Sequence, residues 1–424
     1  MLIIAVFIST VFFYSLVSRR LERTVLTAPI VFTAVGALMS ASHEAVAELA
    51  LDRKDLLLIA ELGLVMTLFS DASRVSPRML KGDTNLPVRL LSTGMLLTIA
   101  LGVLLAMVVF RTLSWWEAGI LAAILAPTDA GLGQVIVNST QVPQRIRQAL
   151  NVEAGLNDGL SVPFLMFFIA LAEATETSQG GGVLTRFLIE QLGYGTLVGL
   201  GVGLLGGWAL GVAQRKAWMA ENIAQLGVMA LPLGCVVASE ASGASMFIAA
   251  FVAGLATQRG FGDVGRHSVE FAEDWGQFLN YFVFFMFGLF VAGVWTQFDA
   301  AIVAYAVLSL TLIRMVPVAI ALRGTRMSRS TVLFMGWFGP RGLASIVLGL
   351  VYLDGATHLP GEQTIKLTAM ATVLLSIVAH GLTALPGIAR YAKAIGALDG
   401  SAPEHQREIE DVDTSRPTHG AVRP

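Results

Sequence analysis

The chain has 424 residues, of which 55% are hydrophobic and only 14% charged, and its formal net charge is −2. This apolar fraction is far above what the core of a soluble domain needs, so the composition predicts a polytopic membrane protein. The nearly balanced charge, without a Lys/Arg-rich run, gives no indication of nucleic-acid binding, and the single cysteine, Cys235, excludes an internal disulfide and a thiolate metal cluster.

Apolar runs bounded by charges or by Gly/Pro clusters predict about thirteen transmembrane helices. In chain order we expect them near residues 2–17, 24–40, 55–70, 86–110, 116–137, 148–172, 188–213, 222–239, 242–257, 276–296, 300–322, 330–353 and 364–389. The first run lacks a preceding positive region and a following cleavage site, which favours a retained helix over a signal peptide. The region 222–257 could instead form one re-entrant hairpin. The last residues of the chain are polar and charged, which predicts a short disordered tail over 396–424 after a transmembrane domain over 1–395.

The basic residues are distributed unevenly between the predicted loops. Loops after odd-numbered helices carry fifteen of them, and the alternate loops carry five: Arg53, Lys54, Arg111, Arg186 and Lys366. By the positive-inside rule this bias places the N-terminus outside and the C-terminus in the cytoplasm of a cell, or inner, membrane.

Two predicted helices are each interrupted by a proline with a charged residue close by. Pro127 precedes Thr128-Asp129 in the fifth helix, and Pro340 precedes Arg341 in the twelfth. Proline removes a backbone donor and frees peptide groups that side chains, water or ions must satisfy. Interrupted helices at matching positions of two halves are typical of inverted repeats that cross at a substrate site, with Asp129 and Arg341 suited to neutralise the half-helix ends. Two ordinary proline kinks are the simpler alternative.

The sixth predicted helix carries an intramembrane acid, Asp158, next to Asn157. Carboxylates within a bilayer usually face a wet cavity and mark an ion or proton pathway, although a structural, hydrogen-bonded acid is the alternative. Removal from water favours the protonated carboxyl, and a group that holds either a proton or a cation, never both, is an exchanger. Oxygen ligands from Asp158, Thr128 and freed carbonyls suit a hard alkali cation such as Na⁺ or K⁺.

Glu153 lies one turn before Asn157 and needs a partner if it is buried. Two intramembrane arginines, Arg314 and Arg341, are available, and we expect a structural ion pair with one of them.

Small residues predict where helices pack closely. Gly155 and Gly159 should admit a neighbouring helix, for which the fifth helix with Thr128-Asp129 is the natural candidate. The seventh helix has glycines at every fourth position from Gly195 to Gly211, a groove for contact either within the fold or across a dimer.

Three motifs together resemble the monovalent cation/proton antiporters of the NhaP/NHE type: Ala-Pro-Thr-Asp-Ala at 126–130, Glu153 with Asn157-Asp158-Gly159, and Gly-Pro-Arg-Gly at 339–342. The resemblance covers about residues 1–390. It implies an all-α integral membrane protein of the NhaA/NhaP-like antiporter fold, with two inverted repeats and a core domain that rocks against a dimerisation domain.

The resemblance also assigns roles to these residues. It makes Asp158 the carrier of cation and proton, places Thr128 and Asp129 in the unwound crossing, and has Asn157 hold that crossing. The Glu–Arg pair of the family falls on Glu153 with Arg314 or Arg341. A single Asn-Asp, where electrogenic relatives have Asp-Asp, implies electroneutral exchange.

One position departs from the family pattern. Sodium-binding relatives often have serine directly after the glutamate, whereas this chain has Ala154. We expect Ser161, one turn from Asp158, or water to supply the missing ligand oxygen.

The leading hypothesis is therefore a homodimeric Na⁺/H⁺ antiporter without a cofactor, with K⁺/H⁺ exchange as the alternative because no motif reads ion radius. An intramembrane aspartyl protease using Asp129 and Asp158 is a more remote alternative, since the motifs of such proteases are absent around both acids. A channel is a third, distinguished by a much faster flux.

Overall fold

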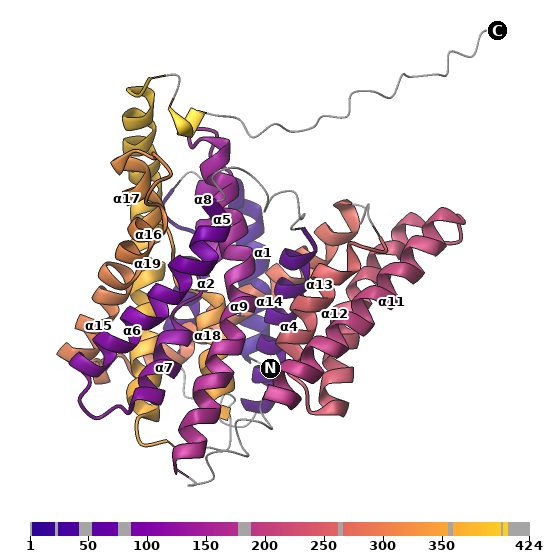
Figure 1. The fold of residues 1–424 in the computed structure, drawn as a ribbon, viewed down its shortest axis with the longest axis horizontal. Coiled ribbons are helices and arrows are strands. Elements are labelled where there is room, and N and C mark those ends of the chain that lie inside the picture. The colour runs from indigo at the N-terminus through magenta and orange to yellow at the C-terminus, as the bar shows by residue number, and fades with distance from the viewer. Residues whose placement is uncertain are drawn as a thin grey trace.

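The computed structural model describes residues 2–21, 24–41, 53–74, 86–176, 188–261, 266–354, 359–399 and 402–405. In this part of the chain all regular structure is helical (Figure 1). The helices are α1 (Leu2–Leu21), α2 (Ala28–Met39), α4 (Arg53–Arg74), α5 (Leu86–Arg89), η1 (Leu90–Gly94), α6 (Met95–Val109), α7 (Trp115–Ile124), α8 (Ala130–Val137), α9 (Gln144–Glu176), η2 (Leu188–Tyr194), α11 (Gly195–Arg215), α12 (Glu221–Ser242), α13 (Met246–Thr257), α14 (Arg266–Ala292), η3 (Trp295–Gln297), α15 (Ala300–Leu310), α16 (Leu312–Ala321), α17 (Arg329–Trp337), α18 (Leu343–Asp354), α19 (Glu362–Gly396) and η4 (Pro403–His405).

These helices confirm the predicted fold class. Each predicted segment overlaps one helix or one interrupted run of helices, and within the described residues eight helices are long and apolar enough to cross a membrane. The region 222–257 forms two helices, α12 and α13, of which α12 is one of the eight.

The predicted interruptions are also present. α7 ends at Ile124 and α8 begins at Ala130, while α17 ends at Trp337 and α18 begins at Leu343. Local sequence fixes two helix starts: Asp129 caps α8 at the first interruption, and Ser114 and Glu117 form a capping box at the far end of α7.

The helices pack in two groups that meet along a seam. The first group comprises α2, α4 and α11–α14, and the second comprises α6–α9 and α15–α19. Figure 1 shows α11, α12 and α13 on one side of the molecule and α15, α16 and α17 on the other, with α9 and α18 between them. At the seam, α4, α13 and α14 contact α9 or α18. A transporter that moves by rocking would slide along this surface.

The glycine stripe of α11 is used within the fold. A Cβ atom at Gly199, Gly203 or Gly207 would lie 2.5 Å from a backbone oxygen of α13. The absence of side chains therefore lets the two helices touch backbone to backbone, which decides between the two uses that the sequence left open.

The predicted tail is described only in part. Pro403–His405 forms a short 3₁₀ helix in which Glu404, a buried side chain, accepts hydrogen bonds from Ser328 N (2.7 Å) and Thr331 Oγ1 (2.8 Å). Arg145 Nη1 donates to the carbonyl of Pro403 (2.9 Å), so this segment is tied to the first turns of α9 and α17. Residues 400–401 and 406–424 of the tail lie outside the described residues, and the domain boundary stays a prediction.

We expect Glu404→Ala to release this segment. Desolvation acts to raise the pKa of the Glu404 carboxyl, but the hydrogen bonds from Ser328 and Thr331 outweigh it and leave the pKa below its ordinary value of 4.5. A lowered pKa means that docking is stabilised above about pH 4.5 and weakens as the pH falls through the pKa of the docked state. Hydrogen–deuterium exchange of residues 402–405 should be slow at pH 6–8 in the wild type and fast in Glu404→Ala. Equal protection in both proteins would show that Glu404 does not hold the segment.

Candidate cation site at the crossing of two interrupted helices

The two interruptions touch each other. Asp129 N donates to the carbonyl of Pro340 (2.8 Å), and Arg341 Nη1 donates to the carbonyls of Ala126 (2.6 Å) and Pro127 (3.0 Å). Arg341 is fully buried. Its guanidinium thus satisfies carbonyls that the break after α7 leaves free, at the partly negative end of that half-helix.

Asp129 performs the opposite task at the helix N-termini. Its Oδ1 accepts from Leu132 N in α8 (2.9 Å), and its Oδ2 accepts from Leu343 N in α18 (2.5 Å). One carboxylate therefore caps two half-helices. Because both oxygens are engaged, Asp129 serves the crossing itself, which makes it a weaker candidate for a cation ligand than the sequence suggested.

The glycines of the Gly-Pro-Arg-Gly motif leave room for this arrangement. A Cβ atom at Gly339 would lie 2.2 Å from Arg314 Nε, and one at Gly342 would lie 2.0 Å from Asp129 Oδ2. Both distances are far below van der Waals contact, so a larger residue at either position would displace a charged side chain.

Two side chains of α19 that the sequence analysis did not consider hold the second break. Ser376 Oγ accepts from Arg341 N (2.7 Å), and His380 Nε2 lies 2.9 Å from the carbonyl of Trp337, the last residue of α17. A serine and a histidine four residues apart in an apolar helix were the available signal.

Asp158 lies beside the crossing, on α9. It is 5% exposed, and its Oδ1 has no hydrogen-bond partner among the described residues. The neighbouring Asn157 donates from Nδ2 to Thr128 Oγ1 (2.6 Å), a contact that ties α9 to the break between α7 and α8. Asp158 thus has a free carboxylate oxygen for a proton or cation. Asn157 Oδ1 is also without a partner among the described residues, while Asn157 Nδ2 is bonded to Thr128.

Glu153 pairs with Arg314. Arg314 Nη1 and Nη2 donate to Glu153 Oε1 (2.5 Å) and Oε2 (2.9 Å), and both side chains are buried. The sequence left Arg314 and Arg341 as alternatives, and Arg341 is not the partner, because the carbonyls of the α7 break hold its guanidinium. The two-bond pairing compensates much of the cost of burying two charges.

A polar cavity of about 360 Å³ lies beside the crossing. Asp129 and Asp158 line it together with a third acid, Asp71 on α4, which the sequence analysis missed. The signal was present, because Asp71 follows directly on the predicted segment 55–70. At the margin of the cavity Arg74 forms an ion pair with Glu273 of α14. Among the described residues the acids do not form a cluster of three that could hold one metal ion together.

One sequence-based expectation about α9 is wrong, and a second, Ser161 as a ligand, stays a prediction. Gly155 and Gly159 do not admit the fifth predicted helix: their Cβ positions face Asp71 of α4 at 3.2 Å and Phe251 of α13 at 2.2 Å. The close approach at Gly155 is what brings Asp71 to the cavity. Ser161 is fully buried, donates to the carbonyl of Asp158 (2.7 Å), and is not among the residues that line the polar cavity. The side-chain hydroxyl is therefore used within its own helix, as is common for serine in membrane helices.

Together, the fold and this site define a multi-pass helical membrane protein in which two interrupted helices cross beside buried carboxylates, the architecture of a secondary transporter. The family model for the transmembrane sodium/hydrogen exchangers matches residues 6–388. The chain belongs to this family.

Individual relatives agree with this assignment. The K(+)/H(+) antiporter NhaP2 of Shewanella baltica (strain OS223) is 26% identical over 288 residues, which are 66% of this chain and 48% of the relative. The Na(+)/H(+) antiporter 2 of Zygosaccharomyces rouxii is 24% identical over 264 residues, 58% of this chain and 32% of the relative. The chain thus spans about half or less of the length of these curated relatives.

The fold is shared with a solved structure, the sodium proton antiporter MjNhaP1 from Methanocaldococcus jannaschii at pH 8. The TM-score is 0.66 at 19% sequence identity, and the match covers 90% of this chain and 99% of the other.

Proposed function

We propose that the protein is a secondary antiporter that exchanges a monovalent cation for protons by competition of the two at Asp158. The observation that carries the proposal is a buried carboxylate with an unpartnered oxygen, at the wall of a polar cavity and next to two capped helix breaks. Family membership supports the same reaction class.

Sodium is the first candidate for the cation and potassium the second, since the named relatives include transporters of each. We infer that Asp158, Thr128 and water supply the ligand oxygens, and that the ionised form of Asp71 draws the cation into the cavity. In this proposal Asp71, not Ser161, offsets the alanine at position 154. The single Asn-Asp at 157–158, through the family resemblance, favours electroneutral exchange.

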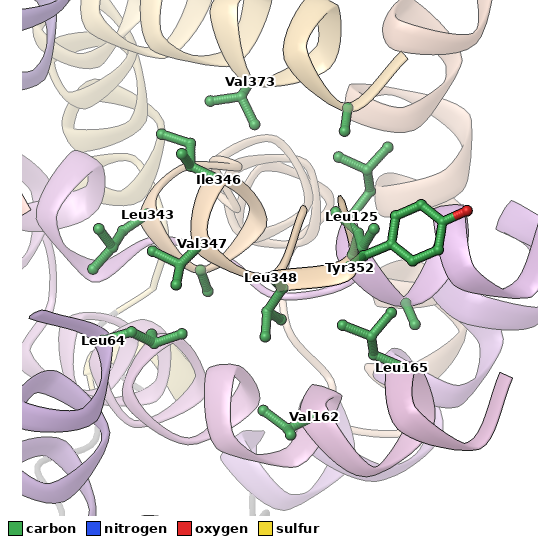
Figure 2. Close-up of a cluster of buried hydrophobic side chains, with 14 of the residues drawn as sticks. Leu64, Leu125, Val162, Leu165, Leu343, Ile346, Val347, Leu348, Tyr352 and Val373 are labelled. Atoms are coloured by element: carbon green, nitrogen blue, oxygen red, sulfur yellow. The ribbon is translucent and has the colours of Figure 1, made fainter. Parts of the chain in front are cut away.

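A layer of apolar side chains closes the polar cavity, which supports transport by alternating access rather than through a channel. Figure 2 shows a cluster of buried hydrophobic side chains that includes Leu64, Leu343 and Val347. Leu343 lines the polar cavity. Along α4, Leu64 lies between Asp71, which lines the polar cavity, and the apolar residues Leu57 and Ala60. The polar path therefore ends at a dry layer, which a cation passes only if the helix groups move.

The geometry argues against the intramembrane protease. Such an enzyme needs two carboxyls that share a proton, but both oxygens of Asp129 accept backbone N–H groups.

Orientation and assembly are part of the proposal. The charge bias favours an outside N-terminus and a cytoplasmic C-terminus in the cell membrane, and the family resemblance favours a homodimer.

The test of the proposal is proton flux in proteoliposomes under an imposed pH gradient. Addition of sodium, then potassium, should alkalinise the acidic lumen, and the more effective ion is the physiological candidate. If neither ion, nor lithium, changes the pH of liposomes that hold folded protein, the proposed reaction is wrong.

A smaller effect is expected at Asp71. Asp71→Asn removes a negative charge from the cavity without touching the crossing, so the KM for the cation should rise roughly three- to tenfold while the maximal rate stays near that of the wild type. Ser161→Ala should leave the KM unchanged. Initial rates over a range of cation concentrations check both variants, and the opposite pattern would make Ser161 the ligand.

A further inference from the structure

A second cavity lies at the other end of the seam between the helix groups. Its volume is about 330 Å³, and α4, α14, α18 and α19 form its walls. On α4, the polar cavity is lined by residues from Thr67 to Arg74 and the second cavity by Leu57 and Ala60. The cluster of Figure 2 separates the two, since Ile346 and Tyr352 of that cluster line the second cavity. In the present arrangement of the helices this cavity is therefore closed off from the polar one.

The face that α18 presents to the second cavity combines a gap with two free hydroxyl groups. Ser345, Gly349 and Tyr352 follow one another at spacings of four and three residues, so they lie on one helix face. A Cβ atom at Gly349 would meet no other atom within 4 Å, which shows open space there. Ser345 and Tyr352 are 2% and 3% exposed, and neither hydroxyl has a hydrogen-bond partner among the described residues.

A positive charge borders this apolar space, and the carboxylates of Glu117 and Glu362 lie near enough to Tyr352 to interact with its hydroxyl. Lys366 of α19 is half-buried, and among the described lining residues it is the only one with a charged side chain. Its methylene stem can lie along the apolar wall while the ammonium group faces a polar partner. The cavity therefore has an apolar interior, with the Lys366 ammonium group and the Tyr352 hydroxyl as polar groups on its wall.

These features select an occupant. An alkali cation is excluded by the apolar wall and the positive charge. In a bilayer an acyl chain gains no hydrophobic driving force by leaving other chains, so occupancy must come from filling a void and from the polar contacts. The volume is at the lower end of ligand pockets, roughly 300–1,000 Å³, which suits one chain better than two.

We propose that this cavity binds a free long-chain fatty acid, with its chain along the Gly349 face of α18 and its carboxylate at Lys366 and the Tyr352 hydroxyl. The bound acid would span the seam, because α4 and α14 belong to one helix group and α18 and α19 to the other. Occupancy would hold the two groups in their present relation. Binding of the acid does not depend on which cation is exchanged, or on exchange taking place.

The test is photolabelling of the full chain in nanodiscs of phosphatidylcholine, with palmitic acid that carries a diazirine in mid-chain as the probe. Fatty acids carry protons across bilayers, so binding is measured rather than exchange. Mass spectrometry should find adducts on residues 345–353 of α18 and 366–373 of α19, and excess palmitate should remove them. Hexadecanol, which lacks the carboxylate, should compete about tenfold less well.

Two variants with matched controls locate the site. Gly349→Leu fills the cavity and should abolish the adducts. Gly201→Leu is the control: it makes the same change on α11, where a Cβ atom also meets open space, and should leave the adducts unchanged. Lys366→Met should weaken labelling about tenfold, and Lys393→Met, at an exposed position of the same helix, should not.

Labelling that is spread over α1 and α11 and is indifferent to Gly349→Leu would overturn the proposal. Displacement of the probe by phosphatidylglycerol as readily as by palmitate would also overturn it, in favour of a phospholipid site. If Gly349→Leu does not fold, the comparison of Lys366→Met with Lys393→Met and the competition by hexadecanol decide whether the fatty acid binds in this cavity.

Discussion

Asp158→Asn is expected to abolish cation/proton exchange while the protein folds and inserts normally. Asparagine has nearly the same shape and can form hydrogen bonds, but it cannot carry the charge that a cation replaces or the proton that is released. Because Asp158 Oδ1 has no partner among the described residues, its loss removes no hydrogen bond of that atom. Dequenching assays in everted vesicles should show no response to sodium or potassium, and size-exclusion profiles should match those of the wild type.

The matched control is Asp274→Asn, the same change at an exposed carboxylate on α14. It should exchange at the wild-type rate. Residual transport in Asp158→Asn close to that of the control would exclude Asp158 as the carrier and direct attention to Asp71, the other aspartate of the cavity that caps no helix.

The second large effect is expected at the buried ion pair. Glu153→Gln leaves the buried Arg314 without a counter-charge, and Arg314→Met leaves Glu153 without one. Removal of one member of such a pair costs about 3–5 kcal/mol. Each single variant should therefore lower the thermal unfolding temperature markedly and reduce the amount of folded protein, and both should lose exchange for this reason.

The double variant Glu153→Leu/Arg314→Met separates stability from transport. Removing both charges together should recover most of the lost stability, since an apolar pair of similar volume is often tolerated. Glu240→Gln, at an exposed position of α12, serves as the control and should change nothing. If the double variant is stable but inactive, the pair acts in transport itself and not only in holding α9 against α16.

The crossing of the interrupted helices was predictable because its causes are local. Pro127 and Pro340 cannot donate a backbone hydrogen bond, and each has a charge close by that suits a half-helix end. Proline alone was not sufficient, because Pro163 and Pro232 lie inside continuous helices. The partner of Glu153 was not predictable in the same way. Arg314 and Arg341 both lie in predicted helices far from Glu153 along the sequence, and no local pattern distinguishes them. Only the positions of the α7 carbonyls, which Arg341 contacts, leave Arg314 for the glutamate.

Asp71 shows the limit of sequence patterns most clearly. The spacing of Gly155 and Gly159 correctly indicated a close helix approach, but spacing does not say which helix approaches. The structure brings α4 and α13 to these glycines, so Asp71 reaches the cavity while Ser161 turns its hydroxyl to its own helix.

The sequence by itself determined the membrane class, the positions of the helices, the two breaks and the identity of the acid on α9. These depend on hydrophobic runs, on proline geometry and on the cost of burying charge, all of which act over a few turns of one helix. The tertiary structure alone decided the partner of Glu153, the use of the α11 groove, the third acid of the polar cavity and the existence of the apolar cavity at the other end of the seam. These depend on contacts between residues far apart in the chain, and such contacts follow from how the two helix groups pack and not from any local pattern.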